Sequence, residues 1–283
     1  LRVYVSARDG GGEEFWVDRT KPLTEALKDR GIEAEIEGFR YSMFAKKYAS
    51  EYWNSIEADL DYRFLRRPAL HIFADATVYG HRPEAPQSNY REIHASLHQF
   101  LSGLLKEMQD ADRLVVWAHS FGCHIISNFI YDNQRGTGAH NPALQGEPAP
   151  LQPLPELDRR LRLLVTTGCN IPLFAAGGPS PVAFARPNDR FRWMNIFDKD
   201  DILGWPIRPL GGDFQAIWIT DHQENTGGPL RSHTNYWFDF GVNDRIATAI
   251  RWLCPLLAEC WQASILPDSL PLRRLIPYHG QCE

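Results

Sequence analysis

The sequence has little of what marks metal-binding, nucleic-acid-binding or membrane-spanning proteins. Its 283 residues include only five cysteines, without Cys-x-x-Cys spacing, so we expect no zinc site. The net charge is −5, and no block of Lys and Arg supplies the basic surface that nucleic acids require. No stretch approaches the roughly 20 apolar residues of a membrane span. We therefore expect no nucleic-acid partner, no stable membrane insertion, and no metal or other cofactor.

The cysteines and the start of the chain bear on its compartment. An odd number of cysteines in a chain of this size is typical of reduced thiols, which favours a cytoplasmic protein. No signal peptide is recognisable, but a chain that begins at Leu1 leaves secretion with a removed leader open. Composition does not define the oligomeric state.

What the chain does contain is enough apolar residues, 43%, for one large α/β domain over residues 1–283. Strand-like runs alternate with helical patterns along it. The expected strands lie at 1–6, 32–41, 70–73, 114–117, 160–167, 190–197 and 214–220, and the expected helices at 20–30, 45–65, 89–108, 123–131 and 246–257. This alternation predicts a mostly parallel central sheet with helices on both faces.

One connection is unusually long. Residues 133–156 are rich in Pro, Gly, Ala and Gln and have no hydrophobic period. Ordinary connections in compact domains are much shorter, so this composition predicts a mobile or lid-like loop. Its scarcity of large apolar side chains argues against a lid that opens on lipid.

The most informative segment is a strand, a turn and a helix. The apolar run at 114–117 is typical of a strand buried on both faces, and Ala118-His119-Ser120-Phe121-Gly122 follows it. This is a small-x-Ser-x-Gly variant of the nucleophile elbow, in which strand and helix approach closely around a strained serine. The following helix directs its positive N-terminal end at Ser120. We therefore predict that Ser120 is a nucleophile.

A nucleophilic serine needs a base to accept its proton and a carboxylate to orient that base. In α/β-hydrolases the order along the chain is Ser, then Asp or Glu, then His. The expected strand 190–197 leads into Asp198, Asp200 and Asp201, and the expected strand 214–220 leads towards His222 and His233. Turns or helix caps would account equally for Asp198 and Asp200, and an ordinary polar loop would account for His222.

Three segments resemble bacterial serine esterases of the α/β-hydrolase superfamily. Thr166-Thr167-Gly168-Cys169-Asn170-Ile171-Pro172-Leu173 is similar to the segment after their sixth strand. Met194-Asn195-Ile196-Phe197 through Asp201-Ile202 resembles their acid segment, and Ser232-His233-Thr234-Asn235-Tyr236-Trp237 resembles their His-x-x-Tyr segment. The resemblance implies an α/β-hydrolase fold, with Asp201 as the triad acid and His233 as the base.

The chain departs from the family pattern at several positions. Ala118 stands where Gly is usual, and Ile202 replaces the Pro that normally follows the acid. The early His-Gly turn, which normally supplies one oxyanion-hole amide, is absent. Asp75-Ala76 with Tyr79 is similar to a Gly-Asp-Ala-x-x-Tyr stretch of some members, and we interpret Asp75 as structural.

Together these features predict a serine hydrolase that cleaves carboxylic esters through an acyl-enzyme at Ser120. The backbone N–H groups of Phe121 and Arg8 are the expected oxyanion donors. The substrate, a small-molecule ester or lipid, is expected to contact Leu173, Phe174 and His119. The apolar side chains of residues 170–184 either line an acyl pocket or are buried for packing.

Two other classes of function fit the same residues. One is a phospholipase or toxin-like lipase that acts on membrane lipids. The other is a non-catalytic binding protein with an α/β-hydrolase fold, because the His-Gly turn is absent.

Overall fold

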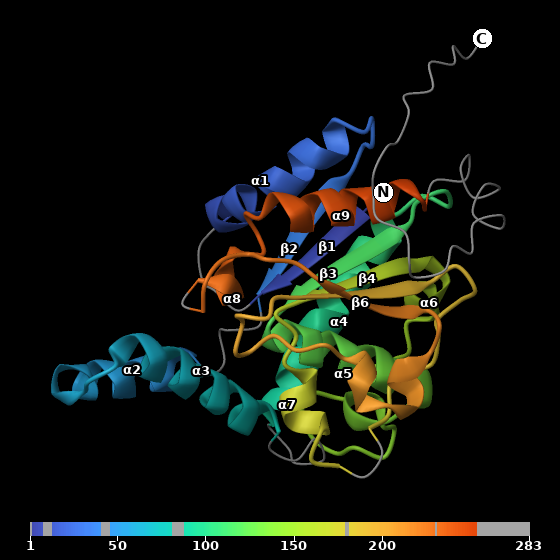
Figure 1. Cartoon of the computed structure of the whole chain (residues 1–283). Helices are drawn as coiled ribbons and strands as arrows, with labels where there is room; N and C mark the ends of the chain where they lie inside the picture. Colours follow the sequence, from blue (N-terminus) through green and yellow to red (C-terminus); the bar gives the residue numbers. More distant parts are fainter. Residues whose placement is uncertain are drawn as a thin grey trace.

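A parallel β-sheet forms the centre of the molecule in the computed structural model (Figure 1), which describes residues 2–7, 13–40, 46–80, 88–178, 181–229 and 231–253. The strands of this described part are β1 (Arg2–Ala7), β2 (Glu35–Arg40), β3 (Leu114–His119), β4 (Leu161–Thr167), β5 (Arg192–Phe197) and β6 (Ile219–Gln223). Their order across the sheet is β2-β1-β3-β4-β5-β6, and every neighbouring pair is parallel. The chain reverses its direction of winding between β1 and β3, where ligand crevices form in doubly wound sheets.

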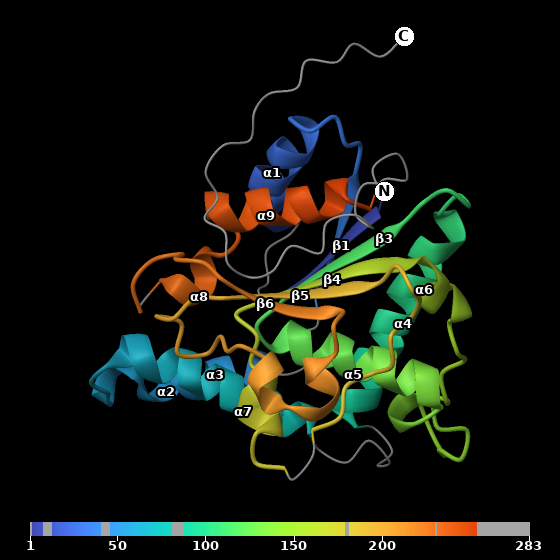
Figure 2. The ribbon, with the colours of Figure 1, turned by 45° about the vertical axis from the view of Figure 1, so that its right-hand side comes forward.

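Helices cover both faces of this sheet, as expected. The α-helices of the described part are α1 (Glu13–Lys28), α2 (Lys46–Ile56), α3 (Arg63–Tyr79), α4 (Asn89–Glu107), α5 (Phe121–Arg135), α6 (Pro155–Arg160), α7 (Ile171–Ala175), α8 (Ser232–Asn235) and α9 (Phe240–Arg251). Figure 2 shows α1 and α9 on one face and α4, α5 and α6 on the other. In the described part of the chain, no helix combines the length and apolarity needed to cross a membrane.

Alternation along β3 divides the core between the two faces. Val115 and Trp117 pack in the cluster under α1 and α9, whereas Leu114, Val116 and Ala118 pack in the cluster under α4 and α5. All of these side chains are fully buried. The strand is therefore apolar throughout because both of its faces are covered, as the sequence indicated.

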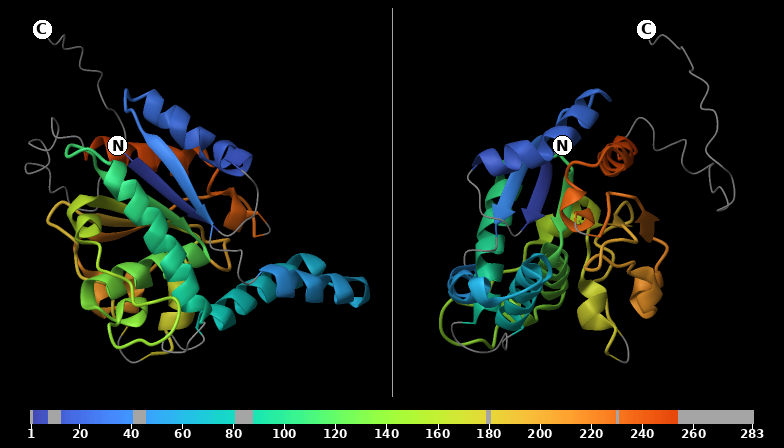
Figure 3. Two further views of the ribbon diagram at one scale, coloured as in Figure 1. Left: turned by 180° about the vertical axis from the view of Figure 1, so that it is seen from behind. Right: turned by 60° about the vertical axis from the view of Figure 1, so that its left-hand side comes forward.

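The expected strand at 70–73 is wrong, because these residues lie in α3. A four-residue apolar run fits a strand and a turn of buried helix equally well, and only its flanks distinguish them. The expected helix at 45–65 is also two elements, since α2 ends at Ile56 and α3 begins at Arg63 after Tyr62, whose φ is 54°. Figures 1 and 3 show α2 and the first part of α3 extending from the body as an arm.

Element boundaries also differ from expectation, and three of these differences are large or bear on candidate site residues. The first helix begins at Glu13 rather than at Thr20, which lies within it. Strand β6 begins at Ile219, because residues 212–215 form a 3-10 turn, so Asp221 and His222 lie inside the strand rather than after it. The last described helix begins at Phe240, where the side chain of Asp239 accepts the Val242 N–H at 2.9 Å.

The long connection after α5 packs along α4. The buried guanidinium of Arg91 in α4 donates hydrogen bonds to the carbonyl oxygens of Gln145 at 2.9 Å and Gly146 at 3.1 Å, and also to that of Pro148. A lid role for residues 133–156 stays a prediction. The Pro-rich tail after residue 263 lies outside the described residues.

The local structure at Ser120 completes the architecture. Strand β3 ends at His119, Ser120 makes the turn, and α5 begins at Phe121. A parallel sheet, helices on both faces and this strand–serine–helix turn together make an α/β-hydrolase fold, which confirms the expected fold class.

Candidate active site

Ser120 has a strained backbone at the end of β3. Its φ is 55° and its ψ −129°, a combination that L residues rarely adopt. The turn is secured on both sides, since the Ser120 N–H donates to the Thr167 carbonyl at 2.9 Å and the Ser120 carbonyl accepts the Cys123 N–H at 3.0 Å. The side chain is thereby lifted out of the sheet at the edge where the parallel strands end.

His233 lies next to Ser120. Its Nε2 is 2.9 Å from the Ser120 Oγ, although 113 residues separate the two along the chain. His233 belongs to α8, and its side chain is 22% exposed, so solvent reaches the pair. A neutral histidine in this position can accept the serine proton.

Asp201 lies on the other side of the His233 ring. Both of its carboxylate oxygens are 3.0 Å from the His233 Nδ1. The same carboxylate accepts the Leu203 N–H at 2.9 Å and the Tyr236 O–H at 3.0 Å. Burial alone would raise the pKa of Asp201. The hydrogen bond from His233 and the electrostatic attraction of that ring, helped by the Leu203 N–H and by His119, outweigh burial and hold this pKa below its usual value.

Asp198 and Asp200 have other surroundings. The carboxylate of Asp198 is buried and accepts the backbone N–H of Thr226 at 2.6 Å and its hydroxyl at 2.9 Å. The Thr226 hydroxyl is also 3.0 Å from the Ser232 carbonyl, so Asp198 anchors the loop that leads into α8. Asp200 is exposed. Of the three carboxylates, the structure brings Asp201 to the histidine.

Two glycines leave room for this arrangement. A Cβ on Gly168, whose φ is +54°, would lie 3.0 Å from the Cε1 atoms of both His119 and His233. A Cβ on Gly204 would lie 2.3 Å from an Asp201 carboxylate oxygen. Any side chain at these positions would therefore displace an imidazole ring or the carboxylate.

The structure describes one of the two expected oxyanion donors. Phe121 is the first residue of α5, so its backbone N–H lies at the positive end of the helix and directly follows Ser120. Arg8 lies outside the described residues. Strand β1, which leads to it, pairs with β3 with Ser6 opposite Ala118.

The expected substrate contacts have different neighbours. Phe174 in α7 packs against Phe121 and His124, with ring centroids 5.8 and 5.2 Å apart, and stays 39% exposed. Leu173 is 45% exposed. Phe184, which the sequence allowed either in the acyl pocket or in the core, is buried against Phe191 and Trp193 and belongs to the core.

His119 lies beside the base, with its ring centroid 4.9 Å from that of His233. His222 is not part of this group: it lies in β6, where its Nε2 contacts the Thr220 hydroxyl at 3.0 Å. Among the described residues, no cluster of His, Cys, Asp and Glu is arranged to hold a metal ion.

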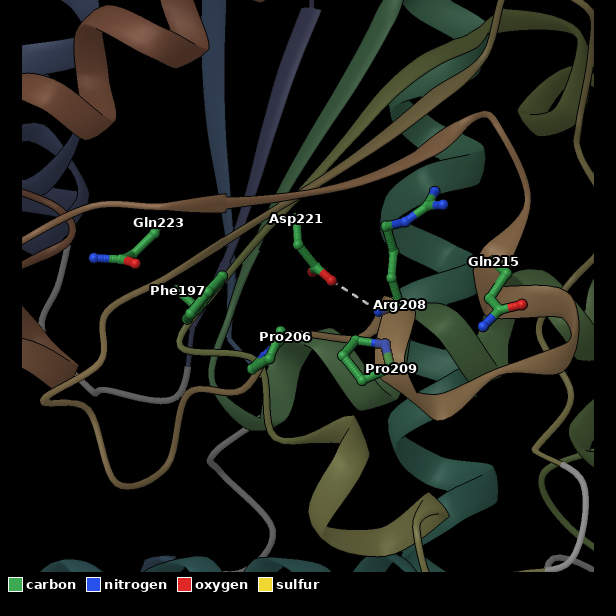
Figure 4. A pocket seen from close by; sticks show the side chains of 7 residues that line it. All are labelled: Phe197, Pro206, Arg208, Pro209, Gln215, Asp221 and Gln223. Carbon is green, nitrogen blue, oxygen red and sulfur yellow. Dashed lines mark hydrogen bonds between the residues drawn. The ribbon is translucent and has the colours of Figure 1, made fainter. Parts of the chain in front are cut away.

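A separate pocket lies at the β6 edge of the sheet and includes none of the predicted site residues (Figure 4). It is lined by Phe197, Pro206, Arg208, Pro209, Gln215, Asp221 and Gln223. Its carboxylate has structural partners, because Asp221 accepts the backbone N–H groups of Ile207 at 3.0 Å and Arg208 at 2.8 Å.

No family model matches the chain. No curated protein matches it either. Among solved structures, the chain is similar to esterase B from Lactobacillus rhamnosis, crystallised with a C4-C4 SN3 tributyrin phosphonate inhibitor. The identity is 14% over 93% of this chain and 78% of that one, with a TM-score of 0.48. A similarity this low carries no argument about function, so the function has to be inferred from the geometry of the site.

Several residues that contact the candidate catalytic side chains or His119 could not be identified from the sequence. Tyr236 and Thr167 lie in the segments that carry the family resemblance, but nothing in their spacing indicated a contact with Asp201 or His119. Gly204 follows Asp201 by three residues, and its need to be glycine arises from a contact across a turn. Such contacts depend on where the strands end relative to one another, which a single sequence does not encode locally.

Proposed function

We propose that the protein is a serine hydrolase that cleaves carboxylic esters, with Ser120 as nucleophile, His233 as general base and Asp201 as the residue that orients the base. The observation that carries this proposal is the hydrogen-bonded chain from the Asp201 carboxylate through His233 to the Ser120 Oγ, with distances of 3.0 and 2.9 Å. Nucleophile, base and orienting group all lie within hydrogen-bond reach, as acyl transfer requires.

The reaction follows from this geometry. Asp201 accepts the Nδ1–H of His233, so Nε2 is unprotonated and takes the proton of Ser120 as the hydroxyl attacks the ester carbonyl. His233 then returns that proton to the departing alcohol oxygen. A water molecule, deprotonated by the same Nε2, attacks the acyl-enzyme and releases the acid.

The negative charge that develops on the carbonyl oxygen needs donors fixed in advance. The Phe121 N–H at the start of α5 is one such donor in this proposal. The second is the backbone N–H of Arg8, because β1 runs parallel to β3 and its end lies at the same edge of the sheet.

We assign the acyl side of the substrate to α7. Leu173 and Phe174 are large apolar side chains that remain 45% and 39% exposed, and Phe174 touches the residue that follows Ser120. Covering them with an acyl chain would remove apolar surface from water, which is favourable by about 25 cal/mol per Å².

Lipid esters are a second candidate substrate class, because exposed apolar residues continue beyond α7. Ile202 is 61% exposed and Trp205 is 44% exposed, and both lie in the turn that contains Asp201. The Trp205 N–H donates to the Cys169 carbonyl at 2.9 Å, which joins this turn to the start of the α7 segment. Activity on long-chain emulsions together with liposome leakage would favour a phospholipase or lipase over an esterase of soluble substrates.

The deciding experiment compares the wild type with Ser120→Ala on p-nitrophenyl acetate and butyrate. We expect turnover to fall by about four to six powers of ten, as in other triad deletions. A fluorophosphonate probe should label the wild type and not the variant, since only an activated serine reacts. Retention of most activity by the variant would refute the assignment, and a wild type that resists the probe would favour the non-catalytic binding protein.

A further inference from the structure

A short polar chain lies behind His233 on the α1/α9 face of the sheet. The Trp117 Nε1–H donates to the Thr167 Oγ1 at 3.0 Å, and the same oxygen is 3.1 Å from the Nδ1 of His119. Trp117 and His119 are two residues apart on β3, so they share a face, and His119 lies opposite Thr167 of β4 in the strand register. None of these contacts is needed for the triad itself.

Counting hydrogens assigns the tautomer of His119. The indole of Trp117 can only donate, so Thr167 is the acceptor in that bond. The single hydroxyl hydrogen of Thr167 then needs an acceptor, and among the described residues the His119 Nδ1 is the one within reach. A buried hydroxyl without an acceptor would be costly. Thr167 therefore donates to Nδ1, and a neutral His119 carries its hydrogen on Nε2.

The surroundings keep His119 neutral. Burial, and next the proximity of His233, hold the pKa of His119 well below its usual value. A neutral ring has one donor and one acceptor nitrogen, which is the condition that the hydrogen count requires.

The remaining donor lies beside the reacting groups. The His119 and His233 ring centroids are 4.9 Å apart. Within the described part of the chain, the hydrogen bond of His119 to another side chain is made by Nδ1, and the residue is 7% exposed. In the proposed reaction His233 protonates the departing alcohol, so a donor next to His233 serves the alcohol side of the substrate.

We propose that Thr167 fixes His119 as the Nε2–H tautomer, and that this N–H donates a hydrogen bond to an acceptor oxygen in the alcohol part of the ester. The substrate class is then an ester whose alcohol carries an ether, hydroxyl or carbonyl oxygen near the ester bond. Thr167 is a positioning residue that acts through His119. The tautomer stands independently of catalysis, whereas the donor role rests on the proposed function.

The tautomer is tested by NMR on the full chain labelled with ¹⁵N-histidine. The His119 signals are identified by their loss in His119→Phe. We expect a protonated Nε2 and an unprotonated Nδ1 in the wild type and in Thr167→Ser, which keeps the hydroxyl. Thr167→Val should show exchange between the two tautomers. A protonated Nδ1 in the wild type would overturn the assignment.

The donor role is tested with two esters of matched shape, 2-methoxyethyl butyrate and butyl butyrate, which differ by one ether oxygen in the alcohol. A hydrogen bond to that oxygen predicts that the wild type prefers the methoxyethyl ester by about two- to tenfold in kcat/KM. The preference should persist in Thr167→Ser and fall to about one in Thr167→Val and His119→Phe. Circular dichroism checks that each variant is folded. If either Thr167→Val or His119→Phe fails to fold, the other still tests the donor role.

The outcomes separate the two proposals. An unchanged preference in both variants would overturn the donor role while leaving the esterase proposal intact. Equal activity of wild type and Ser120→Ala would refute the esterase proposal, and the donor role with it, while the NMR result would still decide the tautomer. Hydrolysis of neither ester by the wild type would also overturn the donor role.

Discussion

Replacing Asp201 by Asn is the most discriminating change in the proposed triad. The carboxylate oxygens receive three different donors: the His233 Nδ1–H, the Leu203 N–H and the Tyr236 O–H. An Asn side chain has only one acceptor oxygen, so its NH2 group must face at least one of these donors. If the NH2 group faces His233, the Nδ1 must accept its hydrogen, and the imidazole adopts the tautomer with hydrogen on Nε2. A protonated Nε2 cannot accept the Ser120 proton.

The magnitude follows from that change of tautomer. In a serine protease the equivalent substitution lowers kcat by about 10⁴ while the geometry is kept. At 1.36 kcal/mol per factor of ten, this corresponds to roughly 5 kcal/mol of transition-state stabilisation. We expect a loss of the same order for Asp201→Asn, measured as kcat on p-nitrophenyl butyrate with the active fraction counted by a fluorophosphonate probe.

The neighbouring carboxylates supply matched controls. Asp200→Asn changes an exposed side chain in the same turn and should leave kcat within about twofold. Asp198→Asn loosens the anchor of Thr226 and should lower stability more than it lowers kcat in the folded fraction. Activity of Asp201→Asn within tenfold of the wild type, or a loss confined to Asp198→Asn, would refute the reasoning.

Three further predictions follow from the same geometry. Because the pKa of Asp201 is depressed in the folded protein, its contribution to stability is present above the usual value of 3.8 and is lost as the pH falls through the lower folded value. The difference in free energy of unfolding between the wild type and Asp201→Asn should therefore shrink as the pH falls below about 4 in urea titrations, and a constant difference would contradict it. Ser120→Gly should raise the free energy of unfolding by about 1 kcal/mol, since Gly adopts a φ of 55° without strain, and an unchanged or lower urea midpoint would argue against that strain. Phe174→Ala should raise KM for p-nitrophenyl butyrate about three- to tenfold and KM for the acetate less, and equal effects on both esters would remove Phe174 from the acyl side.

The parts of the fold that the sequence predicted are those with local signals. The buried strand at 114–117 and the helix at 89–108 are long or apolar enough to be unambiguous, and both are confirmed as β3 and α4. The run at 70–73 is too short for its sequence to distinguish a strand from a helix, and it lies within α3. The start of α9 was missed because its first turn exposes Phe240, which hides the helical period.

In the candidate site too, the features with a local sequence signal were predicted and those that depend on contacts between distant segments were not. The elbow sequence indicated Ser120, and the family resemblance selected Asp201 and His233 from several carboxylates and two histidines. The residues that fix those side chains, among them Gly168, Tyr236 and Thr167, come from neighbouring strands and their loops. Their roles follow from which strands pair and in what register, and this is a property of the folded sheet.

The 113-residue separation between Ser120 and His233 has a consequence for how activity arises during folding. The elbow is local, since β3, Ser120 and α5 are continuous in sequence, and local segments form early. The Ser120–His233 contact closes a much longer loop and requires β4, β5 and β6 to pair in order, which is slow because its entropic cost comes before its contacts. Reactivity of Ser120 towards a covalent probe during refolding therefore times the completion of the sheet rather than the formation of the turn that holds the serine.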